Sequence, residues 1–289
     1  MRSIVHVAEI SALRRLLDEA RAGGRTIGLV PTMGALHAGH SSLVAAAAAS
    51  NDVVVATIFV NPLQFGPTED LAAYPRELDA DRDLAHEAGA AVLFVPSVAE
   101  MYPFGPANVL TSVSVRELTG VLDGASRPGH FDGVATVVAK LFAIAGTCCA
   151  YFGEKDFQQL AVVRRMAADL SFPVEVIGCP IVREPHGLAM SSRNAYLTAG
   201  ERTRAAVLHR ALLAGQALVG AGETSGRRIV DAMTGVIAAE PVATLDYAAV
   251  VDPHTLRAVD EVGGPVRLLV AARVGRARLI DNLGAVPRT

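Results

Sequence analysis

The sequence predicts an α/β protein that combines a Rossmann-like, doubly wound parallel sheet with a second, smaller α+β domain at the C-terminus. Over the first two-thirds of the chain, short β-branched runs alternate with helical patterns, which is typical of parallel βαβ units. The run 53–60 is almost continuously hydrophobic, as expected of a strand that is covered on both faces. The last third instead places helical patterns before strand-like runs, which favours a separate α+β domain.

The expected elements follow one another in a regular order. The strands of the first domain are the β-branched runs at 26–30, 53–60, 91–95, 148–152 and 174–177. The helices between and after them are expected at 41–50, 78–88, 134–145 and 157–170. In the last third we expect helices at 199–220 and 225–239, followed by strands at 246–251, 267–272 and 278–280. We place the domain boundary near 183–187, with a catalytic domain over residues 1–184 and a lid-like domain over residues 185–289.

Composition narrows the class of protein. The 289 residues are 51% hydrophobic and 19% charged, which provides a sizeable core and argues against disorder. The net charge of −3 argues against nucleic acid as the main partner, although a local cationic pocket for one nucleotide is compatible with it. Residues 1–9 carry no secretory signal, and the run 53–60 is too short to cross a bilayer. We therefore expect a cytoplasmic protein without a membrane partner.

The three cysteines do not point to chemistry. Cys148, Cys149 and Cys179 form no C-x-x-C pair, and Cys148 and Cys149 lie in an apolar run that is expected to be a strand. We interpret all three as small buried hydrophobic residues in a reducing cytosol.

The segment PTMGALHAGH at 31–40 links the first predicted strand to a helix. At such a junction, backbone N–H groups and the helix dipole attract phosphate. His37 and His40 are three residues apart and share one face of a helical turn, so both imidazoles can donate to phosphate oxygens. Gly39 lets a nucleotide approach closely. The alternatives are a pair of helix-capping histidines or a metal-binding pair.

The segment FVNPLQFG at 59–66 follows the second strand. Asn61 and Gln64 both donate and accept hydrogen bonds, which suits the hydroxyl and carboxylate of a substrate. The alternative is an ordinary turn that the Asn61 side chain stabilises.

The segment GEKDFQQ, which starts at Gly153, lies at a further strand-to-helix junction. Lys155 is placed to meet phosphate, and Asp156 is placed either to bind a ribose hydroxyl or simply to cap the next helix. Gln159 lies about one turn into that helix and faces the same edge of the sheet.

Two polar loops complete the candidate site. Ser191, Ser192 and Arg193 lie near the domain boundary, where two hydroxyls and a guanidinium suit the clamping of a triphosphate by a closing lid. The alternative is a polar linker. His130, in the loop RPGHFDG, is a candidate either for substrate contact or for fixing the loop.

Taken together, these segments resemble the pantothenate synthetase (pantoate–β-alanine ligase) family. The matching runs, in the order of the family, are PTMGALHAGH, FVNPLQFGP, YPR, RPGHFDGV, YFGEKDFQQL and GLAMSSRN. The last third is similar mainly at LLVAAR and DN. The family belongs to the nucleotidyltransferases with a HIGH-like histidine pair and a mobile KMSKS-like loop, which HAGH and MSSRN represent in this chain.

The resemblance implies an AMP-forming ligase that makes a coenzyme A precursor. The carboxylate of pantoate attacks the α-phosphate of ATP and yields pantoyl adenylate and pyrophosphate. The amine of β-alanine then attacks the acyl carbon and yields pantothenate and AMP. A carboxylate is already ionised at neutral pH, so the first step needs positioning and charge stabilisation rather than a strong base.

The resemblance also implies roles for individual residues. The catalytic residues would be His37, His40, Lys155 and Arg193. ATP would be bound by these four together with Met33, Gly153, Asp156, Ser191 and Ser192. Pantoate would be bound by Met33, Asn61, Gln64 and Gln159. Mg²⁺ would be held by phosphates and Asp81, with Asp79 as the second candidate, and the enzyme would be a homodimer.

Three other functions remain as alternatives. Other adenylyltransferases of the superfamily share a histidine pair but not FVNPLQFGP together with GEKDFQQ. A tRNA-charging enzyme would carry an anticodon-binding module and a basic surface. A module that only senses ATP would not need Gln64 and Gln159 beside the phosphate residues.

Overall fold

The computed structural model describes residues 4–66, 71–72 and 74–288. The chain divides into two compact units. The first contains the residues up to Glu154 and Gln158–Pro180, and the second contains Lys155–Phe157 and the residues from Ile181 onward. The second unit therefore begins four residues earlier than predicted, and it also includes Lys155. The reason at the boundary is local, since Arg183 pairs with Asp281 and Glu184 pairs with Arg202, both in the second unit.

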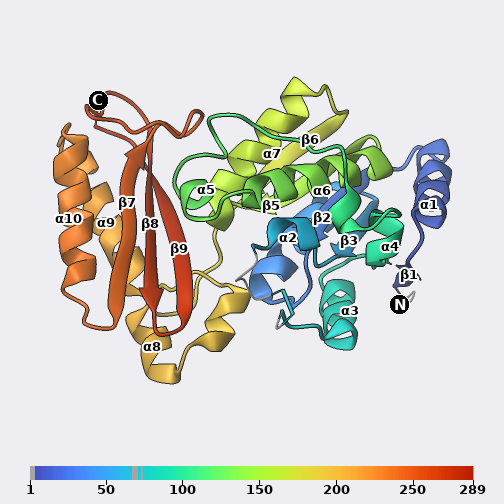
Figure 1. Cartoon of the computed structure of the whole chain (residues 1–289), viewed down its shortest axis with the longest axis horizontal. Helices are drawn as coiled ribbons and strands as arrows, with labels where there is room; N and C mark the ends of the chain where they lie inside the picture. Colours follow the sequence, from blue (N-terminus) through green and yellow to red (C-terminus); the bar gives the residue numbers. More distant parts are fainter. Residues whose placement is uncertain (1–3, 67–70, 73, 289) are drawn as a thin grey trace. The chain divides into compact units, whose positions relative to one another are not determined.

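The first unit is built on a six-stranded sheet in the order β1-β4-β3-β2-β5-β6, in which every pair is parallel (Figure 1). The strands are β1 (Val5–Val7), β2 (Ile27–Thr32), β3 (Val53–Ile58), β4 (Val92–Phe94), β5 (Cys148–Gly153) and β6 (Val174–Cys179). From β2 the chain first builds outward through β3 and β4, and it then returns to add β5 and β6 on the other side. This order confirms the predicted doubly wound fold and puts the switch point between β2 and β5.

Helices cover both faces of this sheet. The longer ones are α1 (Ile10–Ala22), α2 (Ala38–Ser50), α3 (Leu78–Glu87), α6 (His130–Ala145) and α7 (Phe157–Asp169). The shorter ones are η1 (Pro62–Gln64), α4 (Val98–Met101), η2 (Pro106–Asn108), α5 (Asp123–Ser126) and η3 (Glu154–Asp156).

Alternation along the strands explains how both faces are buried. Val30 and Val54 pack with Leu43 of α2 on one face. Successive side chains of a strand point to opposite faces, so the other face is lined by the remaining positions. There Phe152 of β5 meets Phe142 of α6, with ring centroids 6.4 Å apart in an edge-to-face arrangement. The continuous hydrophobicity of the run 53–60 follows from this double cover.

The second unit is an α+β domain, as predicted. Its antiparallel sheet has the order β7-β8-β9, formed by β7 (Ala243–Val251), β8 (Val266–Val274) and β9 (Ala277–Ala285). The helices α9 (Val207–Gly220) and α10 (Gly226–Ala238) pack against this sheet, and Leu212 and Met233 lie in one core with Leu268 and Val270. The remaining elements are η4 (Ser192–Tyr196) and α8 (Ala199–Arg204).

Several elements differ from the prediction. β1 and α1 were not predicted, because β1 is only three residues long and α1 buries a narrow stripe of Leu13, Leu17 and Ala20. α2 begins at Ala38 rather than residue 41, and α6 begins at His130 rather than residue 134. The helix predicted over 199–220 is two helices, because α8 ends at Arg204 and α9 begins at Val207.

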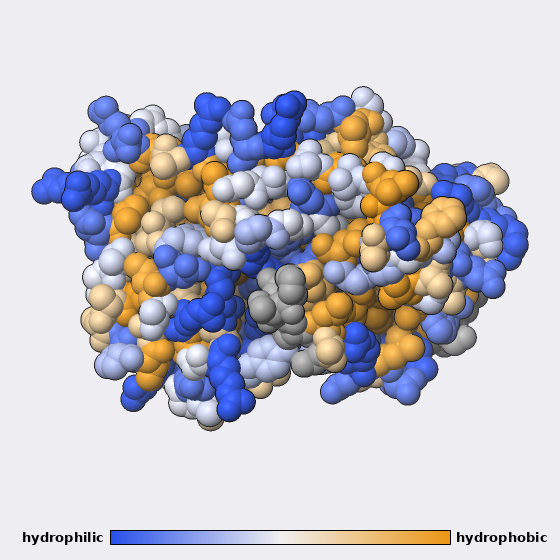
Figure 2. Space-filling view, in the orientation of Figure 1, coloured by the Kyte–Doolittle hydropathy of each residue, from blue (hydrophilic) through white to orange (hydrophobic). Residues whose placement is uncertain are grey.

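The described surface is mixed in polarity. On the face seen in Figure 2, hydrophilic residues are interspersed with hydrophobic ones. Phe104 and Leu110 are the most exposed large apolar side chains described, with exposed fractions of 82% and 99%. Among the residues that the structure describes, no helix combines the length and apolar character that crossing a membrane requires.

The cysteines lie in the sheet of the first unit, and all three are free thiols. Cys148 and Cys179 are buried, while Cys149 is half-buried. Burial raises the pKa of Cys148 to about 12, so this thiol is uncharged at neutral pH. This is the chemistry of a packing residue rather than of a nucleophile.

Candidate active site

The predicted motifs of the first unit lie at one edge of the parallel sheet. β2 and β5 are adjacent, with Gly28 opposite Cys149 and Leu29 opposite Ala150. The loop that follows β2 and the last residue of β5, Gly153, therefore leave the sheet at the same edge. In open α/β sheets, the crevice at such a switch point is where ligands bind.

Asp81 anchors the loop that follows β2. Its Oδ2 accepts a hydrogen bond from the Ala35 N–H at 2.9 Å, and its Oδ1 accepts one from the Leu36 N–H at 2.6 Å. Asp81 lies in the first turn of α3, and its exposed fraction is 2%. Burial raises the pKa of Asp81, while the two backbone N–H groups oppose this rise. The loop needs such an anchor because Ala35 has a φ angle of 51°, in the left-handed region that is unfavourable for a residue with a Cβ atom.

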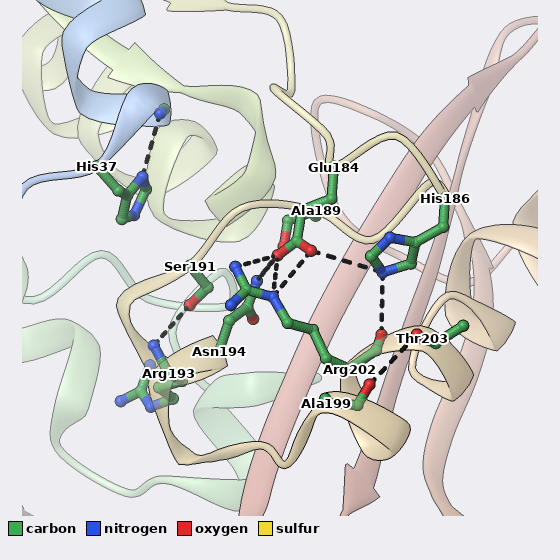
Figure 3. Close-up of polar contacts among 11 residues, drawn as sticks. His37, Glu184, His186, Ala189, Ser191, Arg193, Asn194, Ala199, Arg202 and Thr203 are labelled. Atoms are coloured by element: carbon green, nitrogen blue, oxygen red, sulfur yellow. Dashed lines mark hydrogen bonds and ion pairs between the residues drawn. The ribbon is translucent and has the colours of Figure 1, made fainter.

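His37 and His40 form a capping box at the start of α2. The Nδ1 of His37 accepts the Gly39 N–H at 3.1 Å, a contact drawn in Figure 3, and the Nδ1 of His40 accepts the His37 N–H at 3.3 Å. The two ring centroids are 4.1 Å apart. His37 and His40 therefore cap the helix, which is one of the alternatives that the sequence left open. In a neutral imidazole whose Nδ1 accepts, Nε2 carries the proton, so both rings are set as Nε2–H donors.

Asn61 uses its entire hydrogen-bonding capacity inside the protein. Its Nδ2 donates to Gln64 Oε1 and to the Gly133 carbonyl, each at 3.1 Å. Its Oδ1 accepts from the Tyr102 hydroxyl at 2.7 Å and from the Leu63 N–H at 3.3 Å. An amide side chain has two donor hydrogens and two acceptor lone pairs, and all four are occupied here. The exposed fraction of Asn61 is 1%, so its side chain holds neighbouring residues in place and does not face solvent.

The side-chain amide of Gln64 is oriented by Asn61. Because its Oε1 accepts from Asn61, its Nε2 points the other way and donates to Met33 Sδ at 3.0 Å. This contact joins the loop after β3 to the loop after β2. The Gln64 side chain is thus positioned before any ligand arrives.

His130 fixes the same loop through the backbone. Its Nδ1 donates to the Gln64 carbonyl at 2.8 Å, and its Nε2 lies 2.8 Å from Arg127 Nη1. A guanidinium only donates, so Nε2 is the acceptor and the imidazole is neutral. Of the two roles considered for His130, this geometry favours the fixing of the loop.

Two neighbouring glutamines in α7 have different environments. Gln158 accepts from the Asp123 N–H at 3.1 Å and donates to the carbonyls of Leu118 and Val121, each at 2.8 Å. Gln158 is buried, whereas Gln159 is half-buried, and within the described part of the chain no hydrogen bond is found for the Gln159 side chain. Gln159 is therefore the glutamine of this pair that is available to a substrate.

The second unit carries the remaining candidates. Lys155 Nζ lies 3.0 Å from Asp156 Oδ1, and the Lys155 side chain is 17% exposed. Ser191 caps η4, because its Oγ accepts the Arg193 N–H at 3.3 Å (Figure 3). Ser192 is the first residue of η4, and Ser192 and Arg193 are both half-buried.

Glu184 anchors the segment that holds these serines. Asn194 Nδ2 donates to Glu184 Oε1 at 3.1 Å and to the Ala189 carbonyl at 3.1 Å. The Arg202 guanidinium also converges on Glu184, with Nε at 2.8 Å from both carboxylate oxygens (Figure 3). Burial alone would raise the pKa of Glu184, but hydrogen bonds from Arg202 and Asn194 hold it below its usual value.

The predicted residues thus fall into two sets. The first unit contains Met33, His37, His40, Asn61, Gln64, Asp81, Gly153 and Gln159, and the second contains Lys155, Asp156, Ser191, Ser192 and Arg193. Among the described residues, no group of three or more His, Cys, Asp or Glu side chains is placed to hold a metal ion. Asp79 forms an exposed ion pair with Arg82 at 2.9 Å.

Sequence reasoning missed Tyr102 and the anchoring contacts of Asp81. Tyr102 lies between Met101 and Pro103, where nothing local indicates a contact with Asn61. An acidic residue in the first turn of a helix is common, so Asp81 alone did not predict the contact with the loop after β2.

Comparisons with known proteins identify the family of this chain. The sequence profile of the pantoate–β-alanine ligase family matches residues 5–284. The pantothenate synthetase of Acidobacterium capsulatum is 55% identical over 297 residues, which cover 99% of this chain and 98% of that protein. The crystal structure of pantothenate synthetase from Thermus thermophilus is 49% identical and superposes with a TM-score of 0.91, covering 98% of this chain and all of that one.

The structure of a third relative contains bound ligands. The pantoate–β-alanine ligase of Francisella tularensis, solved in complex with beta-gamma ATP and beta-alanine, is 32% identical with a TM-score of 0.78, and 97% of each chain is covered. Because the family profile spans nearly the whole chain and full-length relatives exceed half identity, this chain belongs to the pantoate–β-alanine ligase family.

Proposed function

We propose that this chain condenses pantoate with β-alanine at the expense of ATP, through a pantoyl-adenylate intermediate, and releases AMP and pyrophosphate. The observation that carries this proposal is the pair of histidines that cap the start of α2, beside the switch point of the sheet. Two Nε2–H donors and the positive end of a helix suit the charge that develops when a carboxylate attacks a phosphate. Family membership supplies the two substrates.

We assign the phosphate contacts to both units. In the first unit His37 and His40 donate to the phosphates, and the main chain at Met33 and Gly153 binds the nucleotide. In the second unit, phosphate oxygens are bound by Lys155, Ser191, Ser192 and Arg193. The Asp156 carboxylate accepts a hydrogen bond from a ribose hydroxyl. His37, His40, Lys155 and Arg193 are catalytic in this proposal, because their charge or donors stabilise the transition state.

Pantoate is bound by neutral groups in this proposal. Gln64 and Gln159 offer amides that pair with both hydroxyl and carboxylate groups, and the backbone at Met33 completes the set. The role of Asn61 is revised from substrate contact to positioning, because its four hydrogen bonds leave no capacity for a ligand.

Mg²⁺ fits the proposal as an ion that arrives with ATP. This metal commonly binds through one or two carboxylates together with substrate phosphates and water. Asp81 can contribute only the lone pairs that its hydrogen bonds to Ala35 and Leu36 leave. When bound, the ion would neutralise phosphate charge.

We also propose that the enzyme is a cytoplasmic homodimer. Phe104 and Leu110, with exposed fractions of 82% and 99%, are apolar side chains of the kind that a subunit interface covers. Light scattering should give twice the chain mass of 30.1 kDa, and the double variant Phe104→Ser, Leu110→Ser should shift toward the monomer. A monomeric wild-type protein would refute the dimer.

Pantoate-dependent exchange of labelled pyrophosphate into ATP tests the function and the histidines together. We expect His37→Asn to lose roughly 100-fold in exchange rate, about 3 kcal/mol, because Asn retains the helix cap but lacks the Nε2–H donor. His40→Ala should lose a similar factor.

The matched control is Ser225→Ala, which removes the cap of the equally long helix α10. It should cost about 1 kcal/mol of folding stability and leave the exchange rate unchanged. Exchange that does not depend on pantoate would overturn the proposed function, and normal exchange in His37→Asn would overturn the role of that histidine.

Calorimetric titration with each ligand separates the pantoate site from the ATP site. We expect Gln64→Ala to weaken pantoate binding more than ATP binding. Tyr102→Phe removes only the hydroxyl that holds Asn61, so it should weaken pantoate binding by roughly a factor of five, about 1 kcal/mol, and leave ATP binding intact. Burial raises the pKa of Tyr102, so this hydroxyl stays a donor at neutral pH. Equal losses for both ligands would show that the loop collapses and that no specific contact is missing.

A further inference from the structure

Strand β9 carries two adjacent buried polar side chains, Asp281 and Asn282. Their exposed fractions are 3% and 2%. Neighbouring residues of a strand point to opposite faces of a sheet, so the two side chains reach different surroundings. A buried carboxylate and a buried amide are costly unless both are fully partnered, so their partners indicate what they do.

Asn282 contacts the segment 155–157, which follows β5, both directly and through Arg267. Its Nδ2 donates to the Lys155 carbonyl at 2.8 Å. Its Oδ1 accepts from Arg267 Nε at 2.7 Å, and the Arg267 guanidinium lies over the Phe157 ring at 4.2 Å. The main chain of Lys155 is thus attached to the small sheet, which explains why residues 155–157 group with the second unit.

Asp281 holds the turn that leads to Ser191. It forms a two-pronged ion pair with Arg183, with Nη1 to Oδ2 at 2.6 Å and Nη2 to Oδ1 at 2.9 Å. Arg183 Nη1 also donates to the Gly187 carbonyl at 3.0 Å, and Arg183 pairs across the turn with Ala189. Bidentate pairs fix orientation as well as distance, so the turn that ends at Ala189, two residues before Ser191, has a defined position on β9.

We propose that Asp281 and Asn282 are positioning residues that attach Lys155 and the segment Ser191–Arg193 to one strand and so fix the spacing of these phosphate-binding groups. This inference rests on the proposed function, in which both groups bind the triphosphate. Asn282 acts through the main chain of Lys155, and Asp281 acts through Arg183 and the turn that follows it.

The chemistry of the reaction gives this spacing its importance. Transfer of an adenylyl group needs donors at several phosphate oxygens at once, and a misplacement of about 1 Å costs up to roughly 100-fold in rate. Side chains on long loops vary in position, whereas two neighbouring residues of a packed strand keep a constant separation. A single support therefore preserves the distance between Lys155 and Arg193.

A double-mutant cycle tests the link between Asn282 and Lys155. Asn282→Asp keeps the oxygen that accepts from Arg267 and removes the N–H that donates to the Lys155 carbonyl. We expect this variant to slow pantoate-dependent pyrophosphate exchange roughly 10-fold. In a Lys155→Ala background, the same change should alter the rate by less than about twofold, because its route of action is already lost.

Gln216→Ala is the matched control for the strand. It breaks a side-chain hydrogen bond of 2.8 Å to the Gly284 carbonyl on the same strand β9, and within the described part of the chain the Gln216 side chain has no hydrogen bond to Lys155 or to Ser191–Arg193. Its exchange rate should equal that of the wild type even if its unfolding midpoint falls as far as that of Asn282→Asp. Effects of Asn282→Asp and Lys155→Ala that multiply would overturn the role of Asn282.

Hydrogen exchange tests the role of Asp281. In Asp281→Asn, amides at 183–190 should lose protection, while they should stay protected in Gln216→Ala. Unchanged protection in Asp281→Asn would overturn this part of the proposal. If Lys155→Ala alone leaves pyrophosphate exchange normal, the proposed function of Lys155 fails. If Lys155→Ala slows exchange and Asn282→Asp does not, only the inference about β9 fails.

Discussion

Two hydrogen bonds from the backbone to the buried carboxylate of Asp81 fix the loop on which the first half of the site depends. A left-handed conformation costs a residue with a side chain about 1–2 kcal/mol, and Ala35 adopts one. The Ala35 N–H donates directly to the Asp81 carboxylate, and this hydrogen bond holds Ala35 in that conformation. The loop then places His37 at the N-cap position directly before α2, where the capping box forms.

The same principle recurs across the site, where hydrogen bonds within the protein set the orientation of the candidate ligand-binding side chains. Capping through Nδ1 is compatible with the proposed phosphate recognition through Nε2, because the two roles use opposite edges of each imidazole. Asn61 is saturated by the protein and in turn orients the amide of Gln64. In the second unit, Glu184 and Asp281 hold the segment around Ser191 from two sides. Positioning is therefore built in before substrates bind, as adenylate formation requires.

The sequence was informative wherever the signal is local. Alternating β-branched runs predicted β2 to β6, and the strand-to-helix pattern placed HAGH at the start of α2 and GEKD at the end of β5. It was uninformative where contacts join distant residues: Asp81 meets Ala35 across 46 positions, Tyr102 meets Asn61 across 41, and Asn282 meets Lys155 across 127. Such pairs arise when whole helices and strands pack together, and the hydrophobic periodicity of a sequence does not reveal them. Asn61 was predicted as a substrate ligand, but its amide is occupied by two local hydrogen bonds, with Leu63 and Gln64, and by two tertiary ones, with Gly133 and Tyr102.

The tautomers of His37 and His40 are the most direct measure of whether the Asp81-anchored loop sets the donors of the site. Nitrogen NMR of the protein labelled with ¹⁵N-histidine, at pH 8 where a free imidazole is neutral, distinguishes a protonated from an unprotonated ring nitrogen. We expect both rings to carry the proton on Nε2 in the wild type and to become tautomeric mixtures in Asp81→Asn. A proton on Nδ1 of either ring in the wild type, or tautomers that Asp81→Asn leaves unchanged, would contradict this account.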